Sequence, residues 1–192
     1  MIKPQFQAIA DEHKKAFDAS FAPASFEVLE QISREIIKAF KAGKKILLCG
    51  NGGSASDSQH IAAEFIGRFK RERKSLPAIA LTTDTSILTA VANDYSYDDI
   101  FSRQVEGLGQ KGDVLIAIST SGNSRNVLAA VRQAKELGIL TIGLTGGEGG
   151  QLKSIVDLCF LARSSKTPHI QEMHITALHA VSEVVENVLF GA

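Results

Sequence analysis

From residue 44 onward, short apolar runs alternate with longer segments whose apolar residues recur at helical spacing. The apolar runs, which predict buried strands, are residues 45–49, 77–81, 114–118, 140–144 and 158–161. The segments that predict helices are residues 55–69, 84–94, 99–108, 123–137 and 168–190. Buried strands that alternate with helices are typical of a parallel sheet with helices on both faces. The pattern therefore predicts an α/β fold with a doubly wound, flavodoxin-like sheet of five parallel strands. In such sheets ligands bind beyond the carboxyl ends of the strands.

The first 43 residues have a different pattern, because apolar residues recur at helical spacing without an intervening strand. These residues are Phe17, Phe21, Phe26, Leu29, Ile32, Ile36, Ile37 and Phe40. Pro23 separates a first helix from a second, and Gly43 ends the second. The apolar surface extends over more than one face of these helices. We therefore expect residues 1–43 to form a helical hairpin that packs against another subunit, within a single domain of residues 1–192.

Composition narrows the classes of function. The chain has 21 basic and 21 acidic residues, so its formal net charge is zero and a nucleic-acid partner is not expected. The one dense basic run, residues 70–74, is interpreted as a solvated turn. The sequence contains neither the apolar core of a signal peptide nor an apolar stretch long enough to cross a bilayer. We expect a cytoplasmic protein without a membrane partner, in which Cys49 and Cys159 are buried free thiols.

A hydroxyl-rich loop follows the third predicted strand and precedes a helix. It reads Ser119-Thr120-Ser121-Gly122-Asn123-Ser124. At a helix N-terminus the helix dipole and exposed N–H groups favour an anion, and a glycine lets the chain turn closely. A Ser/Thr-rich helix cap is the alternative, but four hydroxyls exceed what one cap needs. The loop therefore predicts a phosphate site.

A glycine-rich loop follows the first predicted strand and also opens a helix. It reads Cys49-Gly50-Asn51-Gly52-Gly53-Ser54. Alone, a turn of this kind is common in α/β proteins. Together with the hydroxyl loop at another strand end, it predicts a sugar phosphate held between two strand–helix junctions.

Two predicted helices carry the residues suited to metal binding and proton transfer. His60 and Glu64 lie four residues apart on one helix, and Gln171 and His179 lie eight apart on another. Imidazole and carboxylate groups are zinc ligands, whereas an amide oxygen is a less usual one. The residues alone leave open a surface pair on the first helix and core or interface histidines, His174 and His179, on the second. Glu64 and His179 also suit proton transfer between adjacent sugar carbons.

In combination and order, these motifs resemble the phosphoheptose isomerase family, which has the sugar-isomerase (SIS) fold. The resemblance runs from about Phe17 to the end of the chain. It rests on Gly50, Asn51, Gly52, Gly53, Ser54, Gln59, His60, Glu64, Asn93, Asp94, the 118–124 loop, Gln171, Glu172, Met173, His174 and His179.

The resemblance implies conversion of sedoheptulose 7-phosphate to D-glycero-D-manno-heptose 7-phosphate, the first step towards heptoses of lipopolysaccharide or related glycans. It implies that Glu64 is the base, that His179 is the acid, and that one zinc ion per subunit is held by His60, Glu64, Gln171 and His179. It also implies a homotetramer with active sites at subunit contacts. The residues expected to contact substrate are Asn51, Gly52, Gly53, Ser54, Glu64, Asn93, Asp94, Ser119, Thr120, Ser121, Ser124 and Gln171.

Two non-catalytic alternatives remain. A relative of these isomerases binds the bacterial replication initiator and resembles this chain at residues 75–81 and 170–174, but lacks the groups that correspond to Glu64 and His179. This chain retains both, which favours catalysis. The other alternative, a sugar-phosphate sensor, usually carries an attached DNA-binding domain, for which this chain has no spare residues.

Overall fold

The computed structural model describes residues 2–191, so Met1 and Ala192 of the expected single domain lie outside the described residues. Its centre is a five-stranded, all-parallel sheet with the strand order β2-β1-β3-β4-β5. This is the strand order of flavodoxin-like folds, as the sequence predicts. The strands are β1 (Ile46–Gly50), β2 (Ala78–Ala80), β3 (Val114–Ser119), β4 (Leu140–Gly146) and β5 (Leu158–Ala162).

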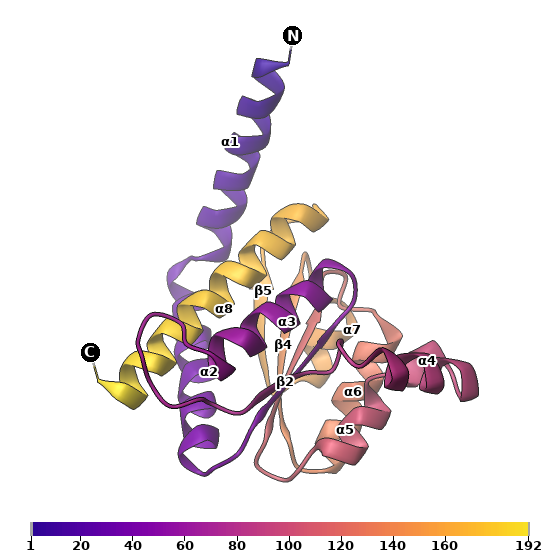
Figure 1. The fold of residues 1–192 in the computed structure, drawn as a ribbon. Helices are drawn as coiled ribbons and strands as arrows, with labels where there is room; N and C mark the ends of the chain where they lie inside the picture. Colours follow the sequence, from indigo (N-terminus) through magenta and orange to yellow (C-terminus); the bar gives the residue numbers. More distant parts are fainter. Residues whose placement is uncertain (1, 192) are drawn as a thin grey trace.

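Helices cover both faces of the sheet (Figure 1). Alternate side chains of a strand face opposite layers, so Ile46 and Leu48 of β1 join one core and Leu47 and Cys49 join the other. The first core is completed by α2 (Pro23–Lys41), α3 (Gly53–Ile66) and α8 (Thr167–Phe190). The second is completed by α5 (Ser102–Leu108), α6 (Arg125–Glu136) and α7 (Gly150–Ile155). The doubly wound α/β prediction is confirmed.

Several element bounds differ from the predicted ones. The predicted helix 99–108 begins only at Ser102, as α5, after a 3-10 turn, η1 (Tyr97–Asp99). Helix α4 (Thr85–Asp94) lies where a helix was expected. Helix α3 begins two residues earlier than predicted and ends at Ile66, so Phe69 lies in the following loop. Helix α7 was not predicted. Its sequence is short and opens with Gly149 and Gly150, which are typical of a loop rather than a helix.

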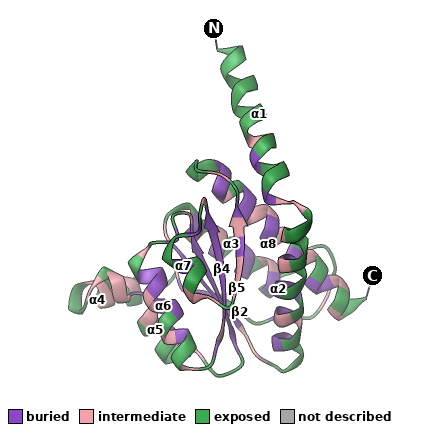
Figure 2. Cartoon of the chain, turned by 180° about the vertical axis from the view of Figure 1, so that it is seen from behind, coloured by how far each residue is buried: buried purple, intermediate pink, exposed green. Residues whose placement is uncertain are grey.

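The N-terminal helices do not form the expected hairpin. Helix α1 (Lys3–Ser20) points away from the body of the domain, and α2 continues in much the same direction along the sheet (Figures 1 and 2). The end of α1 is anchored where the backbone N–H of Arg163 donates to Ser20 Oγ at 2.8 Å, and further back Glu12 and His13 contact the start of α8. Most of α1 is exposed, including Phe6 and Ile9. A helical pattern predicts the helices but not their crossing angle, because that angle depends on what each helix packs against.

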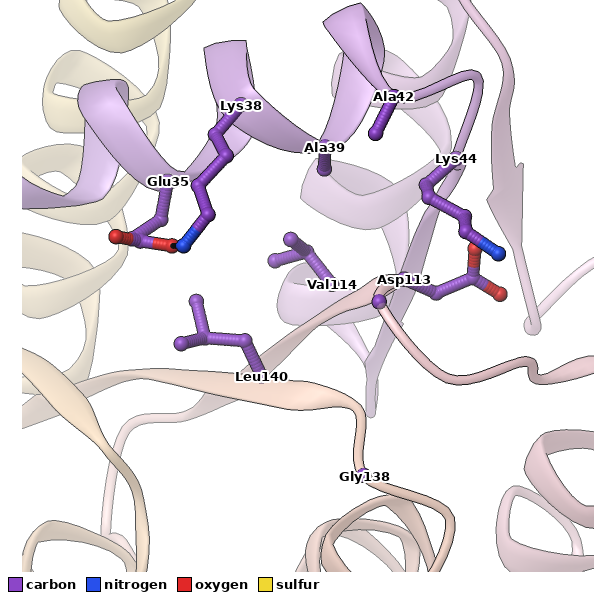
Figure 3. A pocket seen from close by; sticks show the side chains of 10 residues that line it. Glu35, Lys38, Ala39, Ala42, Lys44, Asp113, Val114, Gly138 and Leu140 are labelled. Atoms are coloured by element: carbon purple, nitrogen blue, oxygen red, sulfur yellow. Dashed lines mark hydrogen bonds and ion pairs between the residues drawn. The ribbon is translucent and has the colours of Figure 1, made fainter.

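A hollow of about 280 Å³ lies at the amino ends of the strands, between α2 and the loops before β3 and β4 (Figure 3). Asp113 closes its floor by accepting hydrogen bonds from Lys45 Nζ at 2.6 Å and from the backbone N–H of Gln110 at 2.8 Å. Glu35 and Lys38 at its rim pair with each other across 3.3 Å. These contacts give Asp113, Glu35 and Lys38 structural partners. The hollow lies at the opposite ends of the strands from the predicted ligand loops.

Two further sequence expectations concern cysteines and membranes. Both cysteines are free thiols; Cys49 is buried, and burial raises its pKa to about 12, whereas Cys159 is only partly buried. Within residues 2–191, no helix has the length and apolar character needed to span a membrane.

Candidate functional site

Helices α3 and α8 lie side by side and run in parallel, which brings the predicted site residues of both together. At one end, Gly53 in the first turn of α3 lies so close to Gln171 that a Cβ there would overlap the Gln171 amide. Further along both helices, His60 Nε2 lies 2.9 Å from His179 Nε2. Gln171 and His179 are eight residues apart on α8, and Gly53 and His60 are seven apart on α3, so both pairs can meet when the helices run in parallel. Parallel packing therefore juxtaposes two pairs that are far apart in sequence.

Glu64 completes a cluster with the two histidines. Its Oε1 lies 3.2 Å from His60 Nε2, and ligand atoms of all three side chains lie within 4.8 Å of one another. Two imidazoles and one carboxylate are donors that zinc accepts, with a further position left for an exchangeable ligand. These three donors therefore fit a divalent transition metal, whereas the amide of Gln171, the fourth predicted ligand, lies against Gly53 and about two helical turns from His179.

The environment of His179 favours the neutral form of its imidazole. Burial lowers its pKa, and the neighbouring His60 lowers it further, although the Glu64 carboxylate acts in the opposite direction. The Phe69 ring stacks on His179 with 5.6 Å between ring centroids. A neutral, oriented imidazole can bind a metal or exchange a proton with a substrate. His174, by contrast, is fully buried with Nε2 3.1 Å from the Thr145 carbonyl oxygen, so it is a core histidine.

The hydroxyl loop forms a tight turn at the end of β3. Gly122 has φ of 66°, and a Cβ there would collide with the carbonyl oxygen of Gly149. Ser119 Oγ and Ser124 Oγ are 3.0 Å apart, and the backbone N–H of Asn123 donates to Ser121 Oγ at 3.2 Å. The N-cap of α6, Ser124, makes no side-chain capping bond. The hydroxyls of Ser119, Ser121 and Ser124 therefore lie close to the start of α6, where a helix N-terminus favours an anion.

The glycine loop is held to the hydroxyl loop by an amide pair. Asn51 and Asn126 exchange two side-chain hydrogen bonds of 2.9 Å each, and Tyr97 Oη donates to Asn51 Oδ1 at 3.1 Å. Gly52, with φ of 55°, caps α3, and Ser54 is buried in its first turn. The two predicted loops are therefore neighbours at the carboxyl edge of the sheet.

Asn93 and Asp94, two of the predicted substrate contacts, lie away from the glycine loop, the hydroxyl loop and the His60–Glu64–His179 cluster within one chain. Both lie exposed at the end of α4, which projects from the body of the domain (Figure 1). A hydrogen bond of 2.8 Å links their side chains to each other rather than to the rest of the predicted set.

Several supporting residues were missed by the sequence analysis. Asn126 is a buried amide inside α6, and nothing in its local pattern distinguishes it from a surface residue. Asp57, on α3 before His60, has a buried Oδ2 without a described hydrogen-bond partner, and burial raises its pKa to about 6. The sequence did offer one signal for Asp57, because it lies one helical turn before His60, a predicted metal ligand.

The interpretation of residues 70–74 as a solvated turn is wrong for Arg73. Its side chain is buried, with Nε 3.0 Å from Glu186 Oε2, and it donates to the carbonyl oxygens of Glu64 and Phe65. Glu186 also accepts from the backbone N–H groups of Lys70 and Arg71 at 2.9 Å each. A charge run does not reveal a partner more than one hundred residues away in sequence.

The fold and the paired strand–helix junctions agree with the SIS domain class, whose family model matches residues 14–146. A phosphoheptose isomerase from Clostridium acetobutylicum is 56% identical over 165 residues, which cover 86% of this chain and 84% of the relative. One from Akkermansia muciniphila is 50% identical over 190 residues, covering 99% and 97%. The solved structure of the phosphoheptose isomerase from Neisseria gonorrhoeae superposes with a TM-score of 0.92 at 40% identity, covering 97% of this chain and 100% of that one.

This chain belongs to the phosphoheptose isomerase family and is a sugar-phosphate isomerase of heptose biosynthesis. The identities extend over nearly all of both chains.

Proposed function

We propose that this protein interconverts sedoheptulose 7-phosphate and D-glycero-D-manno-heptose 7-phosphate, with Glu64 as the base and His179 as the acid. The observation that carries the proposal is the convergence of Glu64 and His179 from two parallel helices, beside His60. Aldose–ketose isomerisation needs a base and an acid on either side of adjacent sugar carbons, and a carboxylate and an imidazole suit these roles.

The reaction consists only of proton transfers between the substrate and the side chains of Glu64 and His179. Glu64 removes a proton from the carbon next to the carbonyl, and His179 donates a proton to the carbonyl oxygen, which yields an enediol. Glu64 then returns its proton to the former carbonyl carbon, while His179 takes one from the other hydroxyl. Both side chains finish in their starting states, so the chemistry is balanced without an oxidant or reductant.

The two loops would hold the substrate during these transfers. The hydroxyls of Ser119, Thr120, Ser121 and Ser124 and the start of α6 would bind the phosphate. Asn51, Gly52, Gly53, Ser54 and Gln171 would contact the sugar, and Asn93 and Asp94 would contact it from α4. This assignment is supported by the proximity of the glycine loop to Gln171 and, through Asn126, to the hydroxyl loop.

We also propose that His60, Glu64, Gln171 and His179 hold one zinc ion per subunit. The spacing of the three His and Glu donor groups and the lowered pKa of His179 support this assignment. When bound, zinc would polarise the substrate carbonyl. Glu64 has two carboxylate oxygens, so one could contact the metal while the other faces the substrate.

The test is turnover of sedoheptulose 7-phosphate by the purified full chain and by Glu64→Gln and His179→Gln variants. We expect each variant to lose about two to four orders of magnitude in kcat. Glu183→Gln, at a partly exposed carboxylate that pairs with Lys70 one turn from His179 on α8, is the matched control and should retain normal turnover. Normal kcat in either site variant would remove that residue from the mechanism. No turnover by the zinc-loaded wild type would favour a non-catalytic binding protein.

A further inference from the structure

A second group of metal-ligand side chains lies where α1 meets the first turns of α8. It consists of His13 from α1 and of His169 and Glu172 from α8. His13 Nδ1 lies 2.6 Å and His169 Nδ1 lies 3.2 Å from the same oxygen, Glu172 Oε2. Two imidazole nitrogens therefore converge on one carboxylate oxygen. The two helices, α1 and α8, lie before and after all five strands in the sequence.

The group is buried on the side of His169 and open to solvent on the side of His13 and Glu172. The His169 side chain is only 8% exposed, whereas those of His13 and Glu172 are about half exposed. The second ring nitrogen of His169, Nε2, faces the Glu12 carboxylate at 3.8 Å, and Glu12 is in turn paired with Lys166. A metal-bound histidine characteristically directs its other ring nitrogen at a carboxylate, which fixes the ring and its tautomer. Glu12 lies on the corresponding side of His169, at 3.8 Å, which is longer than a hydrogen bond.

This group is separate from the site proposed for catalysis. Glu172 follows Gln171 directly, but neighbouring helical residues point about 100° apart. Gln171 is directed at Gly53 on α3, whereas Glu172 is directed at His13 on α1. The two groups therefore occupy different sides of α8.

We propose that His13, His169 and Glu172 bind a divalent transition metal ion, zinc fitting best, which ties α1 to α8. Tetrahedral zinc with bonds of about 2.0–2.2 Å separates its ligand atoms by roughly 3.4 Å. The two distances to Glu172 Oε2 need to lengthen by less than about 1 Å to reach that value. Two imidazoles and a carboxylate leave the fourth position to water. The ion would anchor the exposed α1 helix beside Gln171 without taking part in the proposed reaction.

The test uses the full chain, stripped with a chelator and then dialysed against a small excess of Zn²⁺. Bound zinc per chain is measured for the wild type and for His13→Gln and Glu172→Gln. Lys14→Gln, which changes the neighbouring side chain on α1, is the control. We expect each ligand variant to bind one zinc ion fewer per chain than the wild type, and Lys14→Gln to bind as many. Zinc should also raise Tm by several degrees more in the wild type than in the ligand variants.

Location distinguishes this site from the proposed catalytic metal. Crystals of the zinc-loaded His179→Gln variant, measured at the zinc absorption edge, should give an anomalous peak between His13, His169 and Glu172. Absence of that peak, or wild-type zinc content in His13→Gln, would overturn the proposal and leave this group as a metal-free link between the helices. Because these readouts do not depend on turnover, the proposal can fail while the isomerase assignment stands.

Discussion

Gly122 illustrates how a single residue determines the shape of the hydroxyl loop. Its backbone has φ of 66°, and the space where a Cβ would lie is taken by the carbonyl oxygen of Gly149. Leu152 donates its backbone N–H to the Gly122 carbonyl at 2.9 Å, which locks the loop to α7. Gly122 is therefore required both by its backbone conformation and by close packing.

Replacing Gly122 with alanine should separate these two requirements when Gly43→Ala is the control. Gly43 has a similar φ of 71°, but open space surrounds its Cβ position. Left-handed backbone costs alanine about 1–2 kcal/mol, and Gly43→Ala should lose only that. Gly122→Ala should lose more stability in urea unfolding and should raise KM for the sugar phosphate. Equal losses in the two variants would show that the collision with Gly149 is relieved at no cost.

At the scale of elements, the segment between α3 and β2 is fastened to α8 through Glu186. Burial by itself would raise the pKa of Glu186, but hydrogen bonds from the backbone of Lys70 and Phe69, from the Arg73 side chain and from the backbone of Arg71 outweigh it and lower the pKa below its ordinary 4.5. The carboxylate therefore stabilises the folded state in its charged form. This attachment also positions Phe69, whose ring stacks on His179.

Acid should weaken this attachment in a defined direction. The folded pKa of Glu186 lies below the unfolded one, so its full contribution is present above about pH 5 and is lost as the pH falls through the lowered pKa. We expect Glu186→Gln to cost about 3 kcal/mol near neutral pH, because Arg73 is left buried and unpaired. Urea unfolding between pH 3 and 7 should show the wild type and Glu186→Gln converging in stability as the pH falls. The Glu183→Gln variant, which removes only a partly exposed ion pair with Lys70, should follow the wild type, and a constant gap for Glu186→Gln would contradict the assignment.

At the scale of the whole molecule, apolar side chains remain exposed on the face formed by α2 and α8. Phe26 is 56% and Val184 is 46% exposed, beside a groove lined by Phe21, Leu29, Ala180 and Val181. Helix α1 adds Phe6, Ile9 and Phe17. Exposed apolar surface of this extent marks a contact site, and we propose that copies of this chain cover it in a homotetramer.

The tetramer proposal predicts a sedimentation mass four times that of the 20.6 kDa chain. Phe26→Glu and Val184→Glu should each dissociate the assembly, because a carboxylate would be buried without a partner. If active sites lie at subunit contacts, turnover should fall with the tetramer fraction. Leu108→Glu, at a residue 41% exposed on α5, is the control and should leave the mass unchanged. A monomeric wild type, or tetrameric Phe26→Glu and Val184→Glu, would refute the use of this face.

The sequence by itself determined the five strands, all the main helices except α7, and the positions of the glycine and hydroxyl loops, because hydrophobic period and turn residues act locally. It also indicated His60, Glu64 and His179 as candidate site residues, since residue type and helical spacing can be read directly from the sequence. Only the tertiary structure decided which of these side chains meet, because parallel packing of α3 on α8 depends on surfaces distant in sequence. The same reason explains the residues that were missed. Asn126, the Arg73–Glu186 pair and the direction of α1 have no local signature, and each is defined by a partner elsewhere in the chain.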